Sequence, residues 1–483
     1  MGLATWSTQV AFLIGGLALA FLLLIRTSDG SWAFMALLME ASLLDRFTVL
    51  VDGAHVRPEL VVAVPAVLFV SVSALRRRPP PRWLIPDIFL LGWLGLNGLG
   101  SLFAPHPLLS LKEWVSLLLS ASAYFLVRWL TRDRLEEAVQ LLLSLGAAAC
   151  GLGVAAYMGT PFGFSFGSQL NRDAHAMMAL GTFKEADIFG SFAACLLLLA
   201  AGCIVTRQPY KRRAWLALGI SAVALAASLA RTPWLAAPLG AACALIAWRR
   251  AGFTGSVRVL ATAGVIAVVG GIFLALLGTS QPRSATANTV SYPTVAATVA
   301  PPVESPPHLT QTSTVNNRGI VDRIRSLFDL QKDPTVQGRL LTARLAIADW
   351  RKSPLLGRGT ASFGQVYTDS SHQPAWISNI ELRALHDTGL IGLFMFSGFA
   401  IGLTATGLAR RSGSAGNVRN ALVIAVLVLW FAAQGTEPFQ LMWPWILLGL
   451  LATAISNNSP VDFLVQQSFA ETPRPATPES IPG

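Results

Sequence analysis

The residue with the clearest chemical potential is an arginine between two apolar runs. Arg231 lies in the segment SLARTPW, residues 228–234, where almost no loop separates the runs. We expect Thr232 to cap the second helix and Pro233 to occupy its first position. Arg231 then stands beside a helix N-terminus, where free N–H groups and the helix dipole favour an anion. The alternative is a side chain that reaches the lipid headgroups.

Two further groups of charged residues lie next to apolar or amphipathic segments. Arg339 is expected to open a helix that runs to Trp350, although on its own it is equally an ordinary solvated arginine. Arg172 precedes another apolar run together with Lys184 and Asp187. This second group could bind an anion, or it could form a polar collar at the membrane interface.

A fourth cluster lies on a helix expected over residues 376–387. Four polar side chains share one face of this helix at about 100° per residue: Asn379, Arg383, His386 and Asp387. Glu381 points to roughly the opposite side. The polar face could bind sugar or phosphate, or supply a base. The alternative is a solvated face with an i,i+4 ion pair between Arg383 and Asp387.

The composition indicates which elements carry these residues. Hydrophobic residues make up 53% of the 483 residues and charged residues only 13%, whereas soluble domains carry about 25% charged residues. The mean hydropathy is +0.56. The net charge of +11 comes from short basic clusters between apolar runs, which is typical of cytoplasmic loops and argues against nucleic-acid binding. The four cysteines lie inside apolar runs and do not have the spacing of a disulfide framework or a zinc site.

The sequence therefore predicts an all-α membrane bundle of about twelve spans, each close to the 20 residues needed to cross the hydrocarbon core. The expected spans are 8–25, 58–75, 84–104, 110–130, 137–158, 186–205, 214–230, 233–248, 257–278, 388–408, 420–436 and 441–456. Residues 31–50 are interrupted by Glu40, Asp45 and Arg46. We interpret this segment as a re-entrant or interfacial helix on the outer side.

The basic clusters orient the bundle. They fall on one side of the expected spans, which places both termini in the cytoplasm. The predicted domains are a transmembrane bundle at 1–278, an extracytoplasmic loop at 279–387, further spans at 388–456 and a disordered cytoplasmic tail at 457–483. Within the loop, residues 280–317 are rich in Ser, Thr, Pro and Ala and are expected to be disordered. Residues 318–387 are expected to form short amphipathic helices.

Four motifs, in order along the chain, resemble those of the O-antigen ligase and polymerase family. They are Gly181-Thr182-Phe183, the segment 228–234, Gly338-Arg339 followed by PLLGRG at 354–359, and Asn379 followed by LHDTGLIG at 385–392. The resemblance covers about residues 170–405. The chain departs from the family pattern at Ser378, where the family usually has histidine, and at Thr232, where it has glycine.

This resemblance implies a glycosyltransferase of the bacterial cytoplasmic membrane. It would transfer a glycan from a polyprenyl-diphosphate carrier to an acceptor hydroxyl of a glycan, lipid or protein, with inversion and without a metal or other cofactor. Arg231 and Arg339 would hold the diphosphate, assisted by Arg172 or Lys184, because fixed positive charge stabilises a leaving group as its own charge grows. Asn379 and Arg383 would contact substrate. The candidates for the base are His386, Asp387, Asp187 and Glu381.

Two alternatives belong to other classes of protein. The first is a transporter or flippase of lipid-linked glycans, which would be expected to show repeats and broken helices near the bilayer midplane. Here the polar clusters gather on the outer side instead. The second is a membrane scaffold or sensor whose loop binds cell-wall glycan. The sequence does not separate a ligase from a polymerase.

Overall fold

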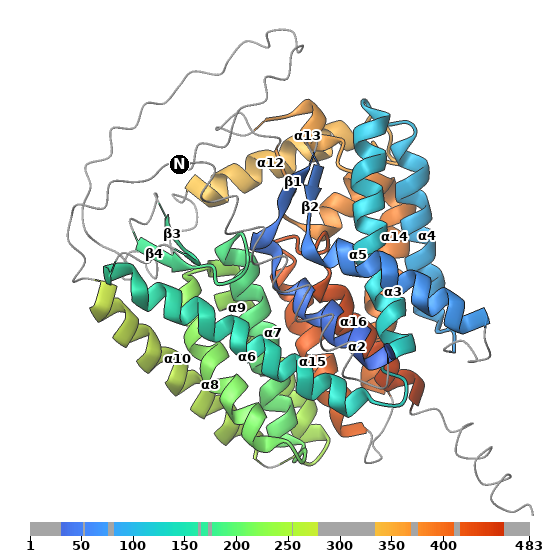
Figure 1. Ribbon diagram of the computed structural model, residues 1–483. Helices are drawn as coiled ribbons and strands as arrows, with labels where there is room; N and C mark the ends of the chain where they lie inside the picture. The colour runs from blue at the N-terminus through green and yellow to red at the C-terminus, as the bar shows by residue number, and fades with distance from the viewer. Residues whose placement is uncertain are drawn as a thin grey trace, which may run out of the picture.

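The computed structural model describes residues 30–51, 54–75, 82–162, 166–171, 176–253, 255–278, 334–368, 375–409 and 416–457. These residues form a bundle of α-helices with two short β-hairpins (Figure 1). The prediction of an all-α protein is confirmed, with the hairpins as a small addition. The expected span at 8–25, the segment 280–317 and the tail beyond residue 457 lie outside the described residues.

The first part of the bundle comprises α2 to α5. Its elements are α2 (Gly30–Ser42), the 3₁₀ turn η1 (Asp45–Phe47), the hairpin β1 (Val49–Val51) and β2 (Ala54–Val56), α3 (Pro58–Leu75), α4 (Ile85–Ser101) and α5 (Pro107–Leu130). Helix α2 has 13 residues, about 20 Å at 1.5 Å per residue, and a hydrocarbon core is about 30 Å thick. This length agrees with the prediction that residues 31–50 do not span.

The second part comprises α6 to α10. Its elements are α6 (Leu135–Gly159), the 3₁₀ turn η2 (Thr160–Phe162), the hairpin β3 (Ser168–Asn171) and β4 (Ala176–Ala179), α7 (Ala186–Val205), α8 (Lys211–Ser228), α9 (Arg231–Arg250) and α10 (Ser256–Gly278). Helix α7 packs against α8, α9 and α15, and nearly every residue along it is buried.

The third part carries the loop helices and the last helices of the bundle. Its elements are α12 (Pro334–Trp350), α13 (Phe363–Val366), α14 (Ile380–Ala409), α15 (Gly416–Ala432) and α16 (Trp443–Asn457). In Figure 1, α12 and α13 lie at one end of the bundle, the same end as the two hairpins. The predicted boundary between residues 387 and 388 falls inside α14, close to Gly389, where the helical conformation is interrupted at φ 67° and ψ −166°.

Several helices in the described part of the chain have membrane-spanning character. Four are long and apolar enough to cross a bilayer by length and composition: Leu135–Gly159, Ala186–Val205, Ser256–Leu274 and Ile380–Leu408. Three shorter helices are also apolar: Pro58–Val72, Asn417–Ala432 and Trp443–Asn457. Every predicted span from 58–75 onward coincides with a helix. The protein is therefore an integral membrane protein, and its total of about twelve spans stays a prediction.

Small residues allow the helices near α7 to approach closely. A Cβ added at Gly190 would lie 2.7 Å from Oγ of Ser228 and 2.9 Å from Cγ of Pro233. A Cβ added at Gly202 would lie 2.6 Å from Cβ of Ala421. Membrane helices associate largely through such close packing, because lipid offers little hydrophobic force between them. The contact at Gly190 sets the turn before α9 directly against the first residues of α7.

Candidate functional site

The turn that carries Arg231 is tight because one residue adopts a left-handed conformation. Helix α8 ends at Ser228, Leu229 has φ 49°, and α9 begins at Arg231 after an extended Ala230. The hydroxyl of Ser228 accepts a hydrogen bond from the Ala230 N–H at 3.3 Å. Arg231 is thus the first residue of α9. The prediction that Thr232 caps this helix is wrong, because the abrupt reversal at Leu229 starts the helix earlier.

Arg339 lies against this same turn. Its Nη1 donates to Oγ1 of Thr232 at 3.3 Å, and its Nη2 forms an ion pair with Oδ2 of Asp187 at 3.0 Å. The side chains of Arg339 and Asp187 are 37% and 32% exposed. Arg339 therefore contacts the residue that follows Arg231 in the chain. Arg339 occupies the second turn of α12 rather than opening it, since that helix already runs from Pro334.

The N-terminal end of α7 completes this arginine site, which we define as Arg231, Thr232, Arg339 and Asp187. Asp187 lies in the first turn of α7. Lys184 is exposed just before that helix, and its backbone N–H donates to Oδ2 of Asp45 at 3.3 Å. Arg172 lies outside the described residues.

A glycine from the connection between α15 and α16 closes the arginine site on another side. A Cβ added at Gly435 would collide with Oγ1 of Thr232 and would lie 3.0 Å from Nη1 of Arg339. Only a hydrogen atom fits at this position without displacing one of the two side chains. Sequence reasoning missed Gly435, because a single glycine between two apolar runs carries no distinctive signal.

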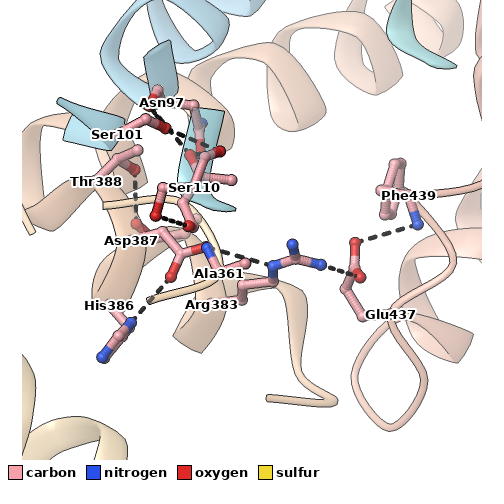
Figure 2. Close-up of polar contacts among 12 residues, drawn as sticks. Asn97, Ser101, Ser110, Ala361, Arg383, His386, Asp387, Thr388, Glu437 and Phe439 are labelled. Atoms are coloured by element: carbon pink, nitrogen blue, oxygen red, sulfur yellow. Dashed lines mark hydrogen bonds and ion pairs between the residues drawn. The ribbon is translucent and has the colours of Figure 1, made fainter. Parts of the chain in front are cut away.

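A second cluster, the His386 network, is built around α14 and is fully buried (Figure 2). His386 Nδ1 lies 2.9 Å from Oδ1 of Asp387, and its Nε2 lies 3.2 Å from Oδ2 of Asp349. The imidazole is 0% exposed and the two carboxylates are 4% and 1% exposed. A neutral imidazole has one N–H and can donate to only one carboxylate, whereas imidazolium donates to both. The network therefore joins the end of α12 to α14.

Asp349 is held in its charged form by several donors. Burial alone would raise its pKa, but hydrogen bonds from Lys352 and His386 and the charge of Arg358 together lower the pKa below the ordinary value of 3.8. A carboxylate with a lowered pKa stabilises the fold above that ordinary value. This contribution is lost as the pH falls through the folded-state pKa, so it is present throughout the neutral range.

Arg383 extends the network toward the connection between α15 and α16. Its Nε lies 3.4 Å from Oδ2 of Asp387, and its Nη1 pairs with the carboxylate of Glu437. The i,i+4 pair of the alternative interpretation is therefore present, but the face that carries it is buried rather than solvated. Figure 2 shows this row of alternating charges. Because the guanidinium is buried between two carboxylates, Arg383 links α14 to the connection between α15 and α16.

Asn379 does not join that row, which differs from the predicted shared face. Helix α14 begins at Ile380 rather than near residue 376, and Oδ1 of Asn379 accepts the Leu382 N–H at 2.8 Å as a helix cap. The Asn379 amide turns instead to Gln434, with Nδ2 3.0 Å from Oε1. Glu381 also faces Gln434, whose Nε2 donates to Oε1 of Glu381 at 2.7 Å.

The segment PLLGRG at 354–359 forms a turn that docks on the backbone of α14. The N–H groups of Arg358 and Gly359 donate to the carbonyls of His386 and Asp387 at 2.8 and 3.0 Å. Gly357 has φ 75°, and a Cβ there would lie 2.5 Å from the Asp387 backbone. The motifs at 354–359 and 385–392 thus pack against each other. Gly357 allows this, because it has no side chain to separate the two backbones.

The arginine site and the His386 network are joined in two ways. Helix α12 carries Arg339 near one end and Asp349 near the other, ten residues and about 15 Å apart. The connection between α15 and α16 contacts Arg339 through Gly435 and Arg383 through Glu437. Sequence reasoning missed Asp349 and Glu437. Glu437 carried a usable signal, since it is an acidic residue between two apolar runs.

Comparison with known protein families relates part of the chain to a described family. Residues 216–397 match the family described as O-antigen ligase. The matched segment includes Arg231, Arg339 and the His386 network up to α14, but it does not include α7 or the connection between α15 and α16. No curated protein matches the chain. Residues 216–397, which are less than half of the chain, are thus similar to the O-antigen ligase family.

Proposed function

We propose that this protein transfers or polymerises a glycan from a polyprenyl-diphosphate carrier on the outer face of the bacterial cytoplasmic membrane. The observation that carries the proposal is the approach of Arg339 to Thr232 at the first turn of α9, beside Arg231. Two guanidinium groups at a helix N-terminus are suited to a diphosphate, which accepts several charge-assisted hydrogen bonds. The ion pair with Asp187 holds Arg339 in place until the diphosphate arrives.

The reaction is proposed as a single displacement at the anomeric carbon. The acceptor oxygen forms a bond to that carbon while the bond to the diphosphate oxygen breaks, which inverts the configuration. The diphosphate leaves with the electron pair, and the arginines stabilise its negative charge where it develops. These cations supply the charge that a metal ion provides in other phosphate-releasing enzymes, so the proposed reaction is metal-independent.

We propose Glu381 as the base that takes the acceptor proton. Among the four candidates, His386 and Asp387 are buried in the network and Asp187 is paired with Arg339. Glu381 has one oxygen bonded to Gln434, and its Oε2 has no hydrogen-bond partner within the described residues. A base must reach the reacting hydroxyl before its pKa matters, so this role requires Glu381 to turn its enclosed Oε2 toward the acceptor. His386 and Asp387 then position the helices.

The proposal is tested with purified protein and polyprenyl-diphosphate oligosaccharide. We expect Arg231→Ala and Arg339→Ala each to reduce the rate of polyprenyl-diphosphate release by at least about 100-fold, the usual loss when a transition-state donor is removed. Arg231→Lys should also be slow, because an ammonium group cannot make the bidentate contact of a guanidinium. Product is measured by chromatography of the released lipid.

Arg344→Ala is the matched control, because this arginine lies on the same helix as Arg339 and is exposed. It should release lipid at the wild-type rate. Normal release by both Arg231→Ala and Arg339→Ala would remove the arginine site from the mechanism. Movement of intact donor across vesicles without cleavage would instead support a flippase.

A further inference from the structure

A group of exposed cations lies at the ends of α8, α9 and α10 that are remote from the arginine site. Helix α9 runs from Arg231 to Arg250, so its two ends are about 28 Å apart at 1.5 Å per residue. The group lies just before or in the first turn of α8, in the last turn of α9 and in the first turn of α10. We call it the basic end, and its members, all exposed, are Arg207, Lys211, Arg212, Arg213, Arg249, Arg250 and Arg258.

Packing between α8 and α10 brings their first turns together. The chain reverses at both ends of α9, so α8 and α10 run in the same direction. A Cβ added at Gly270 of α10 would lie 2.9 Å from Cγ2 of Val223 in α8. Arg258 precedes this contact by twelve residues on α10, and Lys211 precedes it by twelve residues on α8. The two cations therefore lie at the same level of two helices in contact.

The last turns of α7 and α9 adjoin the same place. A Cβ added at Gly202 in α7 would lie 3.3 Å from Cζ2 of Trp248 in α9. Trp248 is followed by Arg249 and Arg250, and Arg207 follows the end of α7 within two residues. The basic end is thus a single surface rather than a set of separate loops.

Acidic side chains do not balance this charge. Residues 188–303, which include α8, α9 and α10, contain no Asp or Glu. Helix α6 packs against α8, and the start of α6 supplies Asp133, Glu136 and Glu137, which are exposed. Arg213 turns toward α6, where its Nη1 donates to Oε1 of Gln140 at 2.8 Å. In the described part of the chain, the seven cations outnumber these three carboxylates, and the surface is net positive.

Apolar side chains face outward directly beside the basic end. Trp215 and Leu216 in α8 are 40% and 60% exposed, about one turn after Lys211. Val257 precedes Arg258 and is also exposed. Farther along α10, an exposed apolar face continues at Val265, Val268, Val269 and Ile272. Tryptophan is enriched where a membrane meets water. Cations at the edge of an apolar face match the two parts of a phospholipid, its headgroup and its acyl chains.

We propose that the basic end binds an anionic phospholipid, with the lipid phosphate among the cations and the acyl chains along the apolar face of α8 and α10. Guanidinium groups suit phosphate oxygens, because they donate parallel hydrogen bonds to them. Basic residues beside a membrane helix attract anionic headgroups, by about fivefold for each cation. Orientation of a bundle requires only basic loops, whereas this inference requires that the protein retain an anionic lipid in preference to a neutral one.

The test uses full-length protein that has been stripped of lipid in a neutral detergent. Native mass spectrometry measures retention of phosphatidylglycerol and of phosphatidylcholine with the same acyl chains. We expect the wild type to retain phosphatidylglycerol at a concentration at least about tenfold lower than phosphatidylcholine. Arg249→Gln combined with Arg250→Gln should reduce this preference at least about fivefold, because two of the clustered cations are lost.

Arg344→Gln combined with Arg351→Gln is the matched control, because it removes two exposed arginines from α12 and the residue that follows it. This variant should keep the wild-type preference. If Arg249→Gln combined with Arg250→Gln does not fold, Lys211→Gln combined with Arg212→Gln takes its place.

Equal retention of the two lipids by the wild type would overturn the inference, as would an unchanged preference in the folded variants of the basic end. An equal loss in the control would overturn it too, because the preference would then follow net charge rather than this surface. The proposed function is tested separately, since no substrate is present in the lipid measurement.

Discussion

At the scale of single residues, charged and polar side chains occur in pairs, and the burial of each pair limits its role. Arg339 and Asp187 are each about one-third exposed, so a diphosphate can compete for the arginine. His386 and Asp349 are almost completely buried, so no substrate reaches them. Groups of the same chemical type thus have different roles according to burial: the exposed pair is suited to binding, and the buried one to structure.

His386→Asn should destabilise the protein by about 3 kcal/mol, because it leaves two buried carboxylates without the imidazole that bridges them. The loss is measured by thermal unfolding in detergent. His106→Asn is the control, because His106 is exposed at the start of α5 and should change stability little. An unfolding temperature equal to that of the wild type for His386→Asn would show that the network does not hold α12.

At the scale of elements, contacts at both ends of α12 fix the position of this helix. Its first turns meet α7 and α9 through Arg339, and its last turn meets α14 through Asp349. The PLLGRG turn that follows docks on the α14 backbone at Gly389, where a Cβ would collide with the carbonyl oxygen of Leu355. Because both ends are held, the position of Arg339 depends on contacts far from it in sequence.

Gly435→Ala tests the contact between α12 and the connection from α15 to α16. The added methyl would collide with Thr232 and displace Arg339, so we expect transfer to fall at least about tenfold with a stability cost of about 1–3 kcal/mol. Gly219→Ala in α8 is the matched control, since a Cβ there meets no atom within 4 Å. Full transfer activity in Gly435→Ala would show that Arg339 tolerates displacement.

At the scale of the whole molecule, Arg339 and Asp349 both belong to α12, which lies at one end of the bundle (Figure 1). The predicted orientation places this end outside the cytoplasm. A lipid-linked donor keeps its tail in the bilayer and its glycan in water, so a site at a membrane surface meets both parts at once.

Cysteine labelling in intact cells checks this orientation. Arg351→Cys, exposed just after α12, should react with a membrane-impermeant maleimide, whereas Lys211→Cys, exposed at the start of α8, should react only after permeabilisation. The background is low, because three of the four native cysteines are buried and Cys243 is half-buried. The opposite labelling pattern would invert the predicted topology.

Most helices were predictable because an apolar run in lipid must satisfy its backbone within itself. The helix positions from residue 58 onward therefore follow from hydropathy. The errors lie at helix ends, where Leu229 starts α9 early and Asn379 caps α14 rather than belonging to it. Helix ends depend on a few torsion angles and on neighbouring segments, and hydropathy does not record these.

The sequence alone determined the membrane class and the bundle of helices, because composition and local charge are properties of the chain itself. Only the tertiary structure decided that Arg339 meets the Arg231 turn, that His386 lies buried between Asp349 and Asp387, and that Gln434 stands beside Glu381. Arg339 and Thr232, His386 and Asp349, and Gln434 and Glu381 are each separated by long stretches of chain. Their contact depends on how the helices pack, and packing is a property of the whole set of side chains rather than of any one segment.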